Sequence, residues 1–185
     1  QGDCTYIKTP DRKHILIDGG GRREGAGDFD VGYEVVLPFL LKNGVRKLDL
    51  MVMSHGHEDH FGGLIPVAKE IEVGAFMEYP PIEPVEKYKT LKEILNNGKI
   101  PCIEVRGGQS FKVGDNVYLD ILYPVSSDDV LHRLYDGNEN NLSLVVRVRF
   151  EDTDILLTGD IEERVESYLS KIWDERVSIL KVAHH

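Results

Sequence analysis

Short apolar runs recur along the chain and end at Gly, Pro or charged residues, and this pattern predicts β-strands. Residues 47–54 form a continuous apolar run, which is typical of a strand buried on both faces. The other runs are shorter or alternate with polar positions. They cover residues 5–10, 14–21, 100–105, 109–113, 116–124, 142–150, 154–159 and 178–183.

Four stretches repeat their apolar residues with helical spacing. They cover residues 32–44, 62–71, 85–98 and 161–173. The clearest is 85–98, in which one face carries Val85, Tyr88, Leu91, Ile94 and Leu95. Pro38 interrupts the first stretch, so we expect a helix to start or kink there. Residues 20–30 and 126–140 are polar and predict loops.

The mixed order of strands and helices predicts an α/β (α+β) fold. Sheets with helices on their outer faces suit this order better than an all-β barrel or a helix bundle. The chain has 185 residues and no internal repeat, so we expect a single domain over residues 1–185.

No apolar run approaches the roughly 20 residues that a membrane span needs, so no membrane contact is expected from this segment.

Charge narrows the range of functions that the chain could have. The formal net charge is -10, which counts against unspecific binding of nucleic acid. It does not exclude a local basic groove, for which Arg22 and Arg23 are candidates, or a site in which cations reverse the local charge. Lys87, Lys89 and Lys92 fit a solvated helix face better.

The stretch "SHGHEDHFGG", residues 54–63, carries the strongest chemical signal. Its spacing is His55-x-His57-x-Asp59-His60, directly after a buried strand and before two glycines. Alternate residues of an extended loop share a side, so His55 and His57 are able to bind one ion while Asp59 and His60 turn toward a second. A solvated loop explains this combination poorly.

Two other apolar strands end in potential metal ligands. Asp160 follows residues 154–159, and His184 follows residues 178–183. Because the ends of such strands gather at one edge of an α/β fold, these side chains are expected to meet the histidine loop. Taken singly, Asp160 also fits a helix N-cap.

At these residues the chain resembles the metallo-β-lactamase fold superfamily. "HGHEDH" matches its HxHxDH motif, "LIDGG" its first motif with Asp18, and "LLTGD" the motif with Asp160. The stretches "GDCTYIKTP", "VVLPFLLKNGVRKLDL", "NENNLSLVV" and "LKVAHH" further resemble the metallo-β-lactamase domain of ComEC-type DNA-uptake proteins and their stand-alone relatives.

The resemblance implies a four-layer αβ/βα sandwich with two divalent ions, Zn or Mn. By matched position, His55 and His57 would bind the first ion, and Asp59, His60 and His184 the second, with Asp160 between them. Asp59, His60 and Asp160 would form the catalytic centre, where a metal-bridged hydroxide attacks the substrate. Asp18 would orient the histidine loop through hydrogen bonds.

The chain departs from the family pattern in two places. The usual histidine of the third motif is missing, and Asn141 and Ser143 stand in that stretch. Asn141 is able to bind a metal weakly, touch a substrate phosphate or cap a turn. The chain also ends at His184 and His185, so the start and the C-terminal end of the full domain are expected to be absent, and either histidine could be the ligand.

The resemblance favours a phosphodiesterase or nuclease acting on DNA, with single-stranded DNA as the possible substrate. A hydrolase of small thioesters, lactones or phosphoesters is the alternative, which the acidic charge favours. A non-catalytic binding domain is the third possibility. As part of a ComEC-type membrane protein the domain would be extracytoplasmic, whereas a stand-alone relative would be cytoplasmic or exported.

Overall fold

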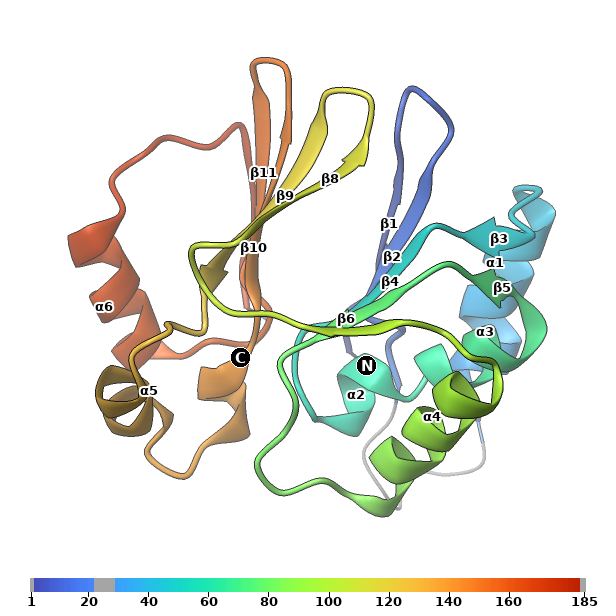
Figure 1. The fold of residues 1–185 in the computed structure, drawn as a ribbon, viewed down its shortest axis with the longest axis horizontal. Coiled ribbons are helices and arrows are strands. Elements are labelled where there is room, and N and C mark those ends of the chain that lie inside the picture. Colours follow the sequence, from blue (N-terminus) through green and yellow to red (C-terminus); the bar gives the residue numbers. More distant parts are fainter. Residues whose placement is uncertain (1, 22–28, 184–185) are drawn as a thin grey trace.

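Two five-stranded sheets face each other in the computed structural model, which describes residues 2–21 and 29–183 (Figure 1). The first sheet has the order β1-β2-β4-β6-β7, and its strands are parallel except that β1 runs antiparallel to β2. These strands are β1 (Thr5–Lys8), β2 (His14–Ile17), β4 (Leu50–Met53), β6 (Phe76–Glu78) and β7 (Cys102–Glu104).

The second sheet has the order β12-β11-β10-β9-β8 and is antiparallel except for the parallel pair β11 and β12. Its strands are β8 (Ser110–Gly114), β9 (Val117–Tyr123), β10 (Val145–Phe150), β11 (Thr153–Leu157) and β12 (Ile179–Lys181). A small parallel pair, β3 (Lys47–Leu48) and β5 (Glu72–Val73), lies beside the first sheet.

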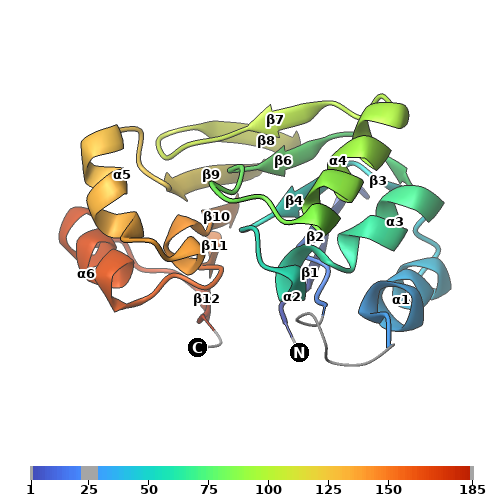
Figure 2. The ribbon, with the colours of Figure 1, turned by 90° about the horizontal axis from the view of Figure 1, so that it is seen from below.

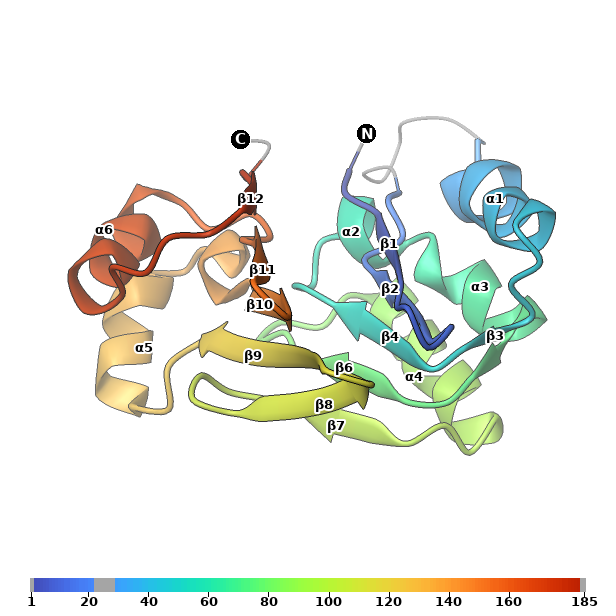
Figure 3. The same ribbon diagram turned by 90° about the horizontal axis from the view of Figure 1, so that it is seen from above.

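Helices cover the outer face of each sheet (Figures 2 and 3). The first sheet carries the π-helical segment η1 (Gly32–Val36), α1 (Leu37–Lys42), α2 (Glu58–Phe61), α3 (Leu64–Glu70) and α4 (Glu86–Asn97). The second carries α5 (Asp128–Tyr135), the 3-10 turn η2 (Glu139–Leu142) and α6 (Glu163–Ile172). The predicted four-layer αβ/βα sandwich is therefore confirmed.

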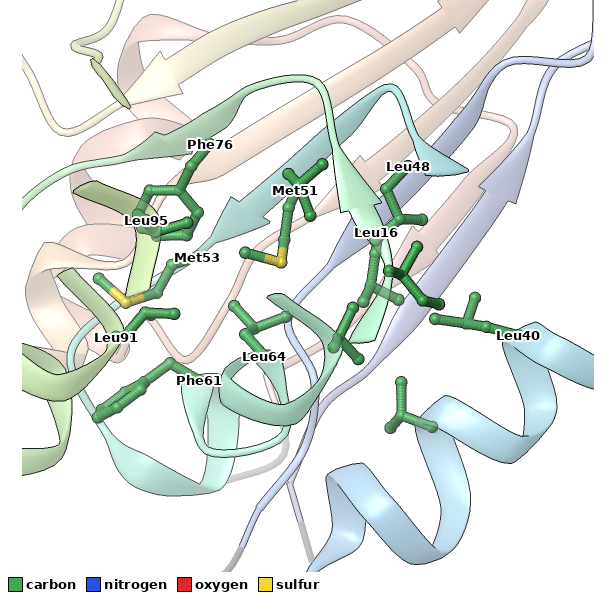
Figure 4. Packing of buried hydrophobic residues seen from close by; sticks show 14 of the residues in the cluster. Leu16, Leu40, Leu48, Met51, Met53, Phe61, Leu64, Phe76, Leu91 and Leu95 are labelled. Carbon is green, nitrogen blue, oxygen red and sulfur yellow. The ribbon is translucent and has the colours of Figure 1, made fainter. Parts of the chain in front are cut away.

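Three apolar cores hold the layers together, and β4 shows why its sequence is a continuous apolar run. Leu50 and Val52 point into the core between the sheets, whereas Met51 and Met53 point into the core beneath the helices (Figure 4). All four side chains are buried. Burial on both faces fixes the position of the residues that follow β4, which include the histidine loop.

The polar loop predicted for residues 126–140 is wrong, because Asp128–Tyr135 forms helix α5. Leu131 and Leu134 lie three residues apart and are buried against the second sheet, while the residues between them face solvent. Two acids, Asp128 and Asp129, occupy its first turn, where the helix dipole favours negative charge. The helix was not predicted because its apolar face is short and most of the residues around it are charged or polar.

Other boundaries also differ from the expectation. Strand β6, which lies between β4 and β7, was not predicted, and the strand predicted from residue 142 begins at Val145, after η2. Pro38 lies in the first turn of α1, but the π-helical turns of η1 lead directly into α1, so the helical stretch does not start at this proline. Within the described part of the chain, no helix is long and apolar enough to cross a membrane.

Candidate metal centre

The candidate metal centre lies at the end of the sandwich where β2, β4 and β11 finish (Figure 1). Asp18 directly follows β2, and residues 54–57 connect β4 to α2. Asp160 follows β11 of the opposite sheet by three residues. Because β2 and β4 are parallel neighbours, their carboxyl ends reach the same edge.

His55, His60 and Asp160 come together in this place. Each offers one ligand atom, and the three atoms lie within 4.8 Å of one another. All three residues are buried, at 1%, 0% and 0% exposure. Two imidazole nitrogens and a carboxylate oxygen form a donor set that suits Zn and Mn, so the residues fit a divalent ion.

Asp18 is the anchor of the histidine loop. Its carboxylate accepts hydrogen bonds from the backbone N–H of Ser54 at 2.7 Å, from Ser54 Oγ at 2.7 Å and from His60 Nδ1 at 2.9 Å. The residue is 2% exposed and has a positive φ of 58°. A non-glycine residue in this conformation stores strain, which the three bonds offset.

Ser54 contacts Asp18 and His55 of the candidate centre and was not predicted from the sequence. Its hydroxyl donates to Asp18 and lies 3.0 Å from His55 Nδ1. The hydroxyl therefore accepts from Nδ1–H of His55, and Nε2 keeps the lone pair that a metal needs. The available signal was its position between the buried strand and the first histidine.

His60 connects the two sheets through Asp160. Its Nε2 lies 3.0 Å from Asp160 Oδ2, while Nδ1 faces Asp18. Burial by itself would lower the pKa of the imidazole, but the hydrogen bonds to Asp160 and Asp18 outweigh it and raise the pKa to about 10. A cation bound between Nε2 and Asp160 would replace the proton on Nε2 that faces the carboxylate.

Ser143 and Gly159 fix Asp160 against the histidine loop. Ser143 Oγ accepts from the backbone N–H of Asp160 at 3.0 Å, and Leu144 N–H donates to the carbonyl of Ser54 at 2.8 Å. A Cβ on Gly159 would lie 2.6 Å from Ser143 Cβ and 3.3 Å from Ser54 Cβ. The end of β11 therefore packs directly on the start of the histidine loop.

His57 and Asp59 lie next to the three central residues. His57 Nδ1 is 3.1 Å from His55 Nε2, and the His57 side chain is partly exposed. Asp59 is 5% exposed and lies on α2 beside His60. The three-residue group does not include either of them.

The side chain of Asn141 bonds to the start of helix α6. Its side-chain oxygen accepts from the backbone N–H of Glu162 at 3.2 Å, and Glu162 is the N-cap of α6. This geometry matches the turn-capping interpretation of Asn141. Asp160 lies two residues before that N-cap, so the helix does not use it as a cap.

The remaining predicted residues divide into two groups. Arg22, Arg23, His184 and His185 lie outside the described residues. The three helix lysines pair with acids: Lys87 with Glu58 at 2.7 Å, Lys89 with Glu86 at 3.0 Å and Lys92 with the buried Glu78 at 2.5 Å. The interpretation of these lysines as a solvated face thus needs one correction, because Lys92 reaches into a buried acid.

Comparison with known proteins points to one family. The model of the metallo-beta-lactamase superfamily matches residues 1–182. ComE operon protein 3 of Bacillus subtilis is 26% identical over 195 residues, covering 100% of this chain and 24% of that protein. Competence protein ComA of Neisseria gonorrhoeae is 28% identical over 187 residues, covering 100% of this chain and 22% of that protein. The chain spans less than a quarter of the length of these relatives.

Solved structures share the fold at low sequence identity. A Cronobacter sakazakii metallo-beta-lactamase with a HARLDQ motif has a TM-score of 0.59 at 15% identity, covering 96% of this chain and 65% of that chain. MEM-A1, a subclass B3 metallo-beta-lactamase from a soil metagenome library, has a TM-score of 0.59 at 15% identity, covering 98% and 72%. These similarities support the fold alone.

Proposed function

The chain belongs to the metallo-beta-lactamase superfamily, and we propose that it is a metal-dependent phosphodiesterase that cleaves DNA. Membership in this superfamily implies divalent metal binding and a hydrolase fold. The observation that carries the proposal is the buried convergence of His55, His60 and Asp160 from opposite sheets. The match of the whole chain to two competence proteins supports DNA as the substrate.

We propose two divalent ions, Zn or Mn, in this centre. His55 and His57 would hold the first, Asp59, His60 and His184 would hold the second, and Asp160 would contribute to both. Ions bound here would supply an activated water and bind the phosphate oxygens of the substrate.

The protein's own residues set the geometry for that chemistry. Asp18 and Ser54 fix the imidazoles of His55 and His60 through Nδ1, so both Nε2 atoms face the centre. Ser143 holds the backbone of Asp160 from the opposite sheet. A centre that is oriented before the substrate arrives needs little rearrangement during the reaction.

Recognition of a phosphate backbone must work against the net charge of -10. Lys87, on α4, already pairs with Glu58 of α2. We therefore propose that the ions, together with Arg22 and Arg23, supply the positive charge that contacts the DNA. The same acidic charge favours the second candidate, a hydrolase of small thioesters, lactones or phosphoesters.

The test is a cleavage assay on metal-free protein supplied with Mn, Zn or Mg. Single-stranded DNA, duplex DNA and a panel of thioesters and lactones are offered in parallel. Asp59→Ala is expected to abolish DNA cleavage because the carboxylate lies within the proposed ligand set. Asp152→Ala is the matched control, since Asp152 is an exposed acid in the turn between β10 and β11.

Each outcome selects one function. Cleavage of DNA that is lost in Asp59→Ala and kept in Asp152→Ala supports the nuclease. Turnover confined to the thioester and lactone panel would transfer the proposal to the small-molecule hydrolase. Metal binding without turnover of any substrate would favour a binding domain.

A further inference from the structure

An ion pair joins the two sheets beside the metal centre. The carboxylate of Asp3 contacts the ammonium of Lys181. Asp3 precedes β1, the edge strand of the first sheet, and Lys181 ends β12, the edge strand of the second. The two side chains are largely buried, at 16% and 27% exposure. Such a pair is less screened by salt than a surface pair.

The pair shares a small cavity with residues that support the proposed metal ligands. Asp3 and Lys181 line a cavity of about 10 Å³ together with Asp18, Ser54 and Gly159. Lys181 Nζ is also 3.5 Å from the carbonyl oxygen of Gly159, the residue before Asp160. The ammonium therefore contacts the residue that directly precedes Asp160, whose carboxylate faces His60.

The backbone around Asp3 packs on the histidine loop as well. The carbonyl of Asp3 accepts a hydrogen bond from Gly20 N–H at 2.6 Å. A Cβ on Gly2 would lie 1.7 Å from the carbonyl oxygen of Asp59, so only a glycine fits against α2 there. Asp3 is thus held in place relative to Asp59 by backbone contacts as well as by its charge.

We propose that Asp3 and Lys181 form a charge-neutral clasp that sets the affinity of the centre for divalent ions. An ammonium near two dications repels them, and the adjacent carboxylate cancels that repulsion. Neither residue belongs to the proposed ligand set, and each acts on the ions through its charge. The inference rests on the proposed metal site but not on the substrate.

The clasp makes a prediction of opposite sign for its two halves. Asp3→Asn keeps the ammonium and removes the compensating charge, so it should weaken Mn²⁺ binding by about tenfold. Lys181→Met removes the ammonium and keeps the carboxylate, so it should strengthen Mn²⁺ binding by about tenfold. The double variant should return to within about threefold of the original affinity.

The experiment is titration calorimetry of the full 185-residue chain with Mn²⁺, at low and at high salt. Melting temperatures of the metal-free variants check that each one folds. The matched control is the exposed ion pair of Lys47 and Glu72, at 2.6 Å, which joins β3 to β5. Lys47→Met and Glu72→Gln should leave the Mn²⁺ affinity unchanged.

The signs of the two effects decide the question. A purely structural link between the sheets would weaken Mn²⁺ binding in both single variants, and that result overturns the clasp. If Asp3→Asn fails to fold, Lys181→Met alone decides, because unchanged or weaker binding contradicts the proposal. A chain that shows the opposite signs but does not cut DNA refutes only the proposed nuclease.

Discussion

Replacement of Gly159 by alanine should disturb the metal centre without removing any ligand. Gly159 has a positive φ of 55°, in the left-handed region. An added Cβ would lie 2.6 Å from Ser143 Cβ and 2.9 Å from Ser143 Oγ, which are distances that real Cβ atoms do not adopt. The end of β11 must therefore shift, and Asp160, the next residue, must move with it.

The expected loss of stability has two parts. An alanine in the left-handed conformation costs about 1–2 kcal/mol. Overpacking against Ser143 and Ser54 adds about 1–3 kcal/mol. Gly44→Ala isolates the first part, because Gly44 has a φ of 75° and no atom within 4 Å of the added Cβ. The two variants should thus differ by about 1–3 kcal/mol in the free energy of unfolding.

Urea unfolding of the metal-free proteins measures these free energies, and Mn²⁺ titration measures the centre. Gly159→Ala should weaken Mn²⁺ binding at least about tenfold, as changes behind the ligands of a metal commonly do. Gly44→Ala should bind Mn²⁺ like the original protein. Equal losses of stability in both variants, with unchanged Mn²⁺ affinity, would show that Gly159 does not hold Asp160 in place.

Four further outcomes are expected. Asp18→Asn places an amide where the carboxylate accepts three hydrogen bonds, so Mn²⁺ affinity measured by calorimetry should fall about 10–100-fold; an unchanged affinity would remove Asp18 from the centre. Mn²⁺ at 100 times its dissociation constant should stabilise the protein by about 2.7 kcal/mol in thermal unfolding, and a chelator should reverse the gain. Leu131→Ala, on the buried face of α5, should lower the free energy of unfolding by about 2–5 kcal/mol; a loss near zero would contradict the packing of that helix. Burial would raise the pKa of Asp120, but the hydrogen bonds with Arg149 outweigh burial and lower that pKa. The stability that the Asp120 carboxylate contributes should therefore be present above about pH 4 and disappear as the pH falls through the lowered pKa. The difference in free energy of unfolding between the original protein and Asp120→Asn should accordingly narrow in acid.

Local patterns of apolar and polar residues were enough to predict several elements of this protein. The continuous apolar run of β4 predicted a strand buried on both faces, and the histidine motif after it predicted a metal site at the end of that strand. Strand periodicity also predicted that Asp160 would emerge at a comparable strand end. The same reasoning failed at α5, where two leucines carry the apolar face and most neighbours are polar, so that the local pattern was too short to recognise.

Which of these groups come into contact depends on how the two sheets pack. His60 and Asp160 are 100 residues apart in the chain, and their contact depends on how one sheet packs on the other. The roles of Ser54, Ser143 and Gly159 depend on the same packing, as does the ion pair between Asp3 and Lys181. Hydrophobic periodicity records which face of a segment is buried, but it carries no information about the distant segment that covers that face.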